Sequence, residues 1–240
     1  MKKLLLGILV LGLILIGIFY QSLKTTYEFY QFQNEYPEVM TDATVTWETI
    51  SFSSSVNFGT VSKPLEINGL SVPIPFEAVY ESGEGFSHAY EAINDDHSVT
   101  IFKPEKLDFF ASYEEEFTDK ERESICTLLK RTSATQACDS PLKFYEALLR
   151  LNPNDATMFT KSDEKLVFLK LMIIKANSLI SGRVSEFETK QFTGYLYHIN
   201  DRNFSVHLFP NENTMYPINF NDMSESEVAN ILSHTTFSNS

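Results

Sequence analysis

The N-terminus of this 240-residue chain carries the feature that most limits how it can fold: residues 4–20 form an uninterrupted apolar run. A helix rises about 1.5 Å per residue, so the run would span roughly 26 Å, close to the thickness of a hydrocarbon core. A cleavable signal peptide usually has a shorter apolar stretch, followed by small residues at the cut. Cleavage after Ser22 would put Tyr20 where a small residue is needed. The run therefore favours an uncleaved transmembrane signal-anchor over residues 1–24, with cleavage as the alternative.

The residues around this run predict an orientation. Lys2 and Lys3 precede it, and positive flanks stay in the cytoplasm. We therefore expect a single-pass protein of a bacterial inner membrane, in contact with the membrane through residues 4–20. Residues 25–43 are expected to form a stalk, and residues 44–240 an extracytoplasmic, periplasmic domain.

The predicted domain is strongly acidic. Lys2, Lys3 and Lys24 are the only charges before residue 25, so 16 basic and 32 acidic residues remain, a net charge of −16. Phosphate contacts require a basic face, which argues against a nucleic-acid partner and against docking on anionic headgroups. The charge is typical of a solvated, tethered domain; the alternative is a surface that recruits a basic partner.

The chain has two cysteines, Cys126 and Cys138. An even number of cysteines in an exported chain predicts a disulfide, and two unrelated buried thiols are the alternative. A zinc site needs a second pair of ligands nearby, and the sequence offers none.

Turn signals and alternating apolar residues predict strands over residues 44–103. In LEINGLSVPIPF, Asn68 and Gly69 form a favoured two-residue hairpin turn, because both positions require positive φ. Pro73 and Pro75 cannot donate to a ladder, which predicts that their strand lies at a sheet edge. A second hairpin is expected from AYEAI and SVTIF.

The middle of the chain is predicted to hold three helices. Thr118 begins a capping box, and Pro141 occupies a favoured first helical position. The third helix, over about 163–181, is apolar nearly all round and is expected to be the most buried. Residues 184–220 return to three strands, and a closing helix is capped by Ser224.

This order of elements predicts an α+β fold: an N-terminal transmembrane helix, then one mainly antiparallel sheet domain with packed helices. The ending, three strands and then SESEVANILSHTTF, resembles the end of Mog1/PsbP-like domains in element order. The resemblance covers roughly a third of the chain. It implies a small sheet-and-helix domain without a shared catalytic set.

A search for reactive groups identifies no strong motif. His198 and His207 are expected as diagonal neighbours on one face of the last hairpin, without a third ligand for a metal. Ser87 and His88, in GFSHA, lack the second glycine of a nucleophile elbow. The acidic run over 114–123 fits the start of a helix better than a calcium loop. The sequence therefore predicts no catalytic, cofactor-binding or metal-binding residue.

The function expected on these grounds is a membrane-anchored, non-catalytic binding or assembly module. The predicted surface for a protein partner is the outer face of the last hairpin, formed by Leu196, His198, His207 and Phe209. The proline-bearing edge near Pro73 is a second expected contact surface. The alternative function is an extracytoplasmic enzyme whose site is assembled from residues distant in sequence.

Overall fold

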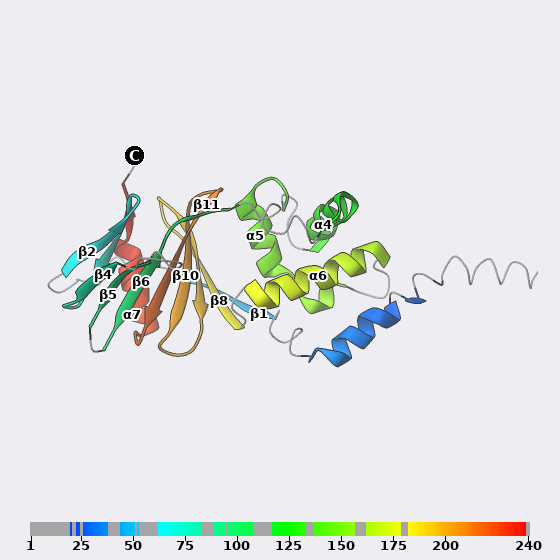
Figure 1. The fold of residues 1–240 in the computed structure, drawn as a ribbon, viewed down its shortest axis with the longest axis horizontal. Helices are drawn as coiled ribbons and strands as arrows, with labels where there is room; N and C mark the ends of the chain where they lie inside the picture. The colour runs from blue at the N-terminus through cyan, green and yellow to red at the C-terminus, as the bar shows by residue number, and fades with distance from the viewer. Residues whose placement is uncertain are drawn as a thin grey trace, which may run out of the picture.

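The protein folds into a helical layer, a large mixed sheet and a second small sheet, as seen in a computed structural model (Figure 1). The structure describes residues 20, 23–24, 26–37, 44–50, 52, 62–82, 89–94, 96–107, 117–132, 137–156, 162–178 and 182–238. Among them the strands are β1 (Val45–Thr49), β2 (Ser62–Ile67), β3 (Leu70–Ile74), β4 (Val79–Ser82), β5 (Ala89–Ile93), β6 (Ser98–Phe102), β7 (Glu105–Lys106), β8 (Gly182–Glu188), β9 (Thr193–His198), β10 (Phe204–Asn211), β11 (Thr214–Asn221) and β12 (Thr236–Phe237). The labelled helices are α4 (Asp119–Thr132), α5 (Pro141–Arg150), the 3₁₀ helix η2 (Pro153–Asp155), α6 (Ser162–Ser178) and α7 (Glu225–His234).

The large sheet has nine strands and runs in the order β1-β8-β9-β10-β11-β6-β5-β4, with β7 paired to β11. Its strand pairs are antiparallel except for the parallel pair of β1 and β8. The predicted α+β class with a mainly antiparallel sheet is therefore confirmed. The sequence did not predict the second sheet, which has the order β12-β3-β2.

The large sheet is covered on both faces. Helices α4, α5 and α6 bury one face together with Tyr195 and Tyr197 of β9. Helix α7 and the small sheet bury the other face together with Leu196 of β9 and Val206 of β10. Consecutive residues of β9 are therefore buried, instead of alternating between core and solvent as in a sheet with one wet face.

The hairpin predicted at Asn68 and Gly69 and the one predicted from AYEAI and SVTIF are both confirmed, as the pairs β2–β3 and β5–β6. Asn68 and Gly69 have φ of 44° and 86°, and the turn pairs Ile67 with Leu70. The predicted edge position of the proline-bearing strand is wrong, because β3 is the middle strand of the small sheet. Strand β12 returns from the C-terminus and pairs with β3 at Ser71 and Leu70, so its short ladder needs no donor from the prolines.

The helix starts also follow the sequence signals. The Thr118 backbone N–H donates to the Glu121 carboxylate, and Ser140 accepts from the backbone N–H of Lys143 at the start of α5. At α7, Ser224 forms a complete capping box with the third helical residue. Each cap satisfies backbone donors that the first turn of a helix leaves without partners.

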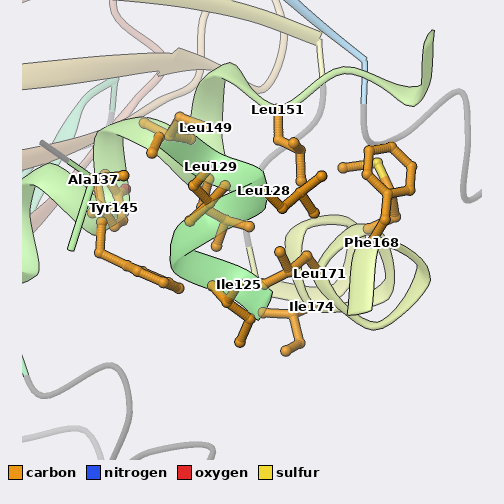
Figure 2. Packing of buried hydrophobic residues seen from close by; sticks show 14 of the residues in the cluster. Ile125, Leu128, Leu129, Ala137, Tyr145, Leu149, Leu151, Phe168, Leu171 and Ile174 are labelled. Carbon is orange, nitrogen blue, oxygen red and sulfur yellow. The ribbon is translucent and has the colours of Figure 1, made fainter. Parts of the chain in front are cut away.

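The helical layer is held by aliphatic packing and by a crosslink. Ile125 and Leu129 of α4 pack with Leu171 of α6 in one cluster (Figure 2). The sulfurs of Cys126 and Cys138 lie 2.07 Å apart, at disulfide distance, as the sequence predicts. The crosslink ties α4 to the segment that leads into α5.

The segment expected to be a stalk is partly folded into this layer. Residues 26–35 are helical, and Phe29 is buried with its ring centroid 5.9 Å from that of Phe168. An aromatic side chain of this segment therefore contributes to the helical core. The predicted span, residues 4–20, lies outside the described residues except for Tyr20. No helix in the described part of the chain is both long and apolar enough to cross a membrane.

Candidate functional site

The predicted partner surface on the last hairpin does not exist as an exposed face. Leu196 and Phe209 are both buried. Leu196 packs in the cluster under α7, and Phe209 packs in the cluster under α4, α5 and α6. The prediction of these two residues as surface anchors is wrong, because both faces of the sheet are covered and neither is an outer face.

The two histidines of that prediction also lie apart, on opposite faces of the sheet. The hairpin closes with the Ile199 N–H donating to the carbonyl of Asn203, and His198 pairs with Phe204. The expected position of the two histidines on one face requires a turn one residue longer than this one. A shift of one residue moves every side chain of a strand to the other face, so His198 lies on the α7 side and His207 on the α5 side.

His207 belongs to a buried cluster of hydroxyl groups between α5 and the sheet. The Tyr145 hydroxyl hydrogen-bonds to Nδ1 of His207 and to the hydroxyl of Tyr197. Burial lowers the pKa of His207 to about 4 and raises the pKa of both tyrosines well above the ordinary value. At neutral pH the cluster is therefore uncharged, and its hydrogen bonds fix α5 on the sheet.

Two further buried polar groups extend this structural role. The Tyr195 hydroxyl donates to the Glu146 carboxylate at 2.8 Å, which also receives Lys143 at 2.9 Å. The buried Lys175 ammonium donates to the carbonyls of Leu149 and Leu151 at the end of α5. These carbonyls have no partner within their own helix, so Lys175 completes the helix end although burial lowers its pKa to about 8.

His198 lies in a second polar cluster, where β1 and β8 meet the start of α7. Its Nε2 is 3.1 Å from the Ser185 hydroxyl oxygen. Arg183 donates to Glu48 at 2.7 Å and to Glu225 at 3.1 Å. Burial and the Arg183 charge lower the pKa of His198, whereas the two carboxylates act in the opposite direction.

The Ser185–His198 distance is one at which a base could activate a hydroxyl nucleophile. Ser185, however, is fully buried in the sheet, so a substrate has no access to its oxygen. Arg183 bridges two strands and a helix through its carboxylate partners, and this cluster holds β1, β8 and α7 together. Ser87 and His88 of the GFSHA motif lie outside the described residues.

The described residues do not assemble a metal site, because no three His, Cys, Asp or Glu side chains among them lie close enough to share an ion. A groove of about 610 Å³ lies beside the Asn68–Gly69 turn and the strand β12. Among the residues that line it, Glu66 has the one ionisable side chain. Acid–base chemistry usually requires a convergent set of such groups, and this groove does not supply one.

Exposed apolar side chains gather instead on the helical layer, which sequence reasoning missed. Leu166 and Ile173 lie seven residues apart on α6 and are exposed, although this helix was expected to be the most buried. Four more apolar side chains start at the last residue of the N-terminal run, and we call them the N-terminal stripe: Tyr20, Leu23, Tyr27 and Tyr30. Their regular spacing was the sequence signal that could have identified them.

No known protein family, no curated protein and no solved structure matches this chain. The resemblance in element order to Mog1/PsbP-like domains therefore gains no support from these comparisons.

Proposed function

We propose that this protein is a membrane-tethered, non-catalytic binding or assembly module of a bacterial cell envelope. The N-terminus would be cytoplasmic, residues 4–20 would form the retained anchor, and the folded part would lie in the periplasm. The observation that carries the proposal is the position of the exposed apolar surface. It lies on the helical layer, immediately after the apolar run.

The distribution of exposed large hydrophobic side chains supports a contact surface on this layer. Ten such side chains are exposed among the described residues, and seven of them lie between residues 20 and 36 or on α6. Scattered single apolar residues are ordinary on a protein surface, but a concentration on one layer marks an interaction site. The helical layer is therefore the surface that would meet a partner.

The polar groups of the described residues support a binding role over catalysis. The His207 cluster lies beneath α5 and holds that helix on the sheet, and the hydroxyl of the Ser185–His198 pair is inaccessible. A tether raises the local concentration of any partner in the same membrane, so a modest surface is sufficient for assembly. The acidic character of the chain would steer a basic protein partner toward it.

Affinity capture from membranes tests this function. The full-length protein would carry its tag at the C-terminus, which lies at the opposite end of the molecule from the helical layer (Figure 1). We expect a co-purified envelope protein to be lost with the double variant Leu166→Ser and Ile173→Ser. It should be retained with Val79→Ser, which removes an exposed apolar side chain from the distant strand β4.

Two outcomes would overturn the proposal. One is capture that is unchanged by the double variant, which would exclude the helical layer as the contact surface. The other is turnover of a substrate by the purified full-length protein, which would replace the binding role with the enzyme alternative.

A further inference from the structure

The N-terminal stripe has the spacing of a coiled-coil seam. Tyr20, Leu23, Tyr27 and Tyr30 follow one another at intervals of three, four and three residues, and residues 20, 23–24 and 26–35 are helical. The alternation of three and four places apolar residues at the a and d positions of a heptad, on one narrow line of the helix. All four side chains are between 51% and 66% exposed.

The N-terminal stripe occupies one of three faces of the helix that includes residues 26–35. A second face is already covered, because Phe29 is buried against Phe168 and the Lys165 ammonium donates to the Thr26 hydroxyl at 2.5 Å. A third face is charged, with Lys24 and Glu28 paired at 3.6 Å. The helix therefore has two apolar faces, and among the described residues only one of them is covered.

We propose that the N-terminal stripe pairs with the same stripe of a second copy of this chain, as a short parallel coiled coil that starts where the chain leaves the membrane. This inference rests on the proposed tether, which would bring both copies out of the bilayer in the same direction and at high local concentration. Tyr20 and Tyr27 take the a positions, and Leu23 and Tyr30 the d positions. The Tyr27 hydroxyl already accepts a hydrogen bond from Gln31 of its own helix.

The flanking residues favour a second copy over a lipid surface. In a parallel pair, the g position Thr26 and the e position Gln31 that flank the seam are both uncharged, and the Thr26 hydroxyl stays with Lys165 of its own chain, so this flank has no like-charge repulsion. A helix that lies in a membrane interface presents a broad apolar face and a polar face rich in lysine and arginine. This helix has a narrow seam and the acidic residues Glu28 and Glu35 on its polar side.

Cysteine cross-linking of the full-length chain tests the pairing. Leu23→Cys and Tyr27→Cys place a thiol on the seam, and Glu28→Cys places one on the charged face as the matched control. The native cysteines are at disulfide distance from each other, so the introduced thiol is the reactive one. The positions are exposed, so the substitutions leave the core intact. Mild oxidation is applied to the membrane and soluble fractions, followed by non-reducing electrophoresis.

We expect at least five times more disulfide-linked dimer at the two seam positions than at the control position. This pattern in the membrane fraction supports both the seam and the tether. The same pattern in the soluble fraction alone would support the seam and overturn the tethered function. Equal cross-linking at all three positions, or none at any of them, would overturn the seam.

Discussion

His207 shows at the residue scale how burial determines the behaviour of a titratable group in this fold. Its imidazole lies under α5 beside the Tyr145 hydroxyl, and burial lowers its pKa to about 4. An unfolded histidine has a pKa near 6.5. Between these two values the unfolded chain binds a proton that the folded chain does not bind. The contribution of His207 to stability is therefore present above about pH 6.5 and is lost as the pH falls toward 4.

We expect His207→Gln to weaken the acid sensitivity of the protein. Between pH 6.5 and pH 4 the free energy of unfolding of the wild type should fall by about 2 kcal/mol more than that of the variant, less than the full pKa shift implies, since His207 as a residue is only partly buried. Urea unfolding at a series of pH values measures both curves. Parallel curves would show that His207 does not titrate in this way.

Gly194 of β9 gives a second prediction at this scale. A Cβ atom at this position would lie 2.2 Å from Cζ of Phe187, whose ring is buried in the core under α7. We expect Gly194→Ala to lower the free energy of unfolding by about 3 kcal/mol, because the added methyl group overpacks the core and forces a buried ring to shift. Denaturant unfolding provides the measurement.

The double variant with Phe187→Leu is the control for this contact. Shortening the ring should relieve the clash, so the double variant should lose less stability than the sum of the two single losses. If the loss of unfolding free energy in the double variant equals the sum of the two single losses, the destabilisation by Gly194→Ala does not come from contact with the Phe187 ring.

The sequence predicts the conformation of residues that depend on local geometry, but not the burial of residues that depend on distant parts of the chain. The positions of Asn68 and Gly69 were predictable because positive φ is a local property of a turn. The burial of Leu196 and Phe209 was not, because it depends on the register of a hairpin and on elements that arrive from distant parts of the chain. The one-residue error in the turn separated His198 from His207, whereas the partner surface failed because both faces of the sheet are covered.

At the scale of elements, a disulfide links helix α4 to the segment that leads into α5. Cys126 lies within α4, and Cys138 lies 12 residues further along the chain, just before α5. A disulfide that closes a loop of this length restricts the unfolded chain and typically stabilises a protein by about 3 kcal/mol.

We expect the double variant Cys126→Ser and Cys138→Ser to lose about that amount in denaturant unfolding. Reduction of the wild type should produce a similar loss, and the variant should not respond to reductant. Two free thiols titrated in the unfolded, non-reduced wild type would contradict the predicted bond.

The helix starts were predictable from sequence, whereas the strand partners were not. Thr118, Ser140 and Ser224 each satisfy donors within three residues, so their signals are local. The parallel pairing of β1 with β8 joins residues more than 130 positions apart. The residues next to β1 and β8 contain no information about this pairing. The pairing of β12 with β3 is equally long-range, so local sequence does not predict it either.

At the scale of the whole molecule, the layers lie in a defined order from the N-terminus. The helical layer is nearest to the N-terminal segment, the large sheet follows, and the small sheet with α7 and the C-terminus lies at the far end (Figure 1). If residues 4–20 hold the chain in a membrane, this order sets the helical layer next to the bilayer and the small sheet away from it. The α+β class was predictable from element order, but the covering of both faces of the sheet was not.

The retention of the N-terminal run is the central claim, because the tether, the orientation and the pairing of two copies depend on it. Mass spectrometry of alkaline-washed membranes from cells that express the full-length protein tests it directly. If the run is retained, peptides from residues 1–24 will be recovered there, still joined to the folded part of the chain. A soluble form of the protein that begins between Gly17 and Thr26 would contradict it.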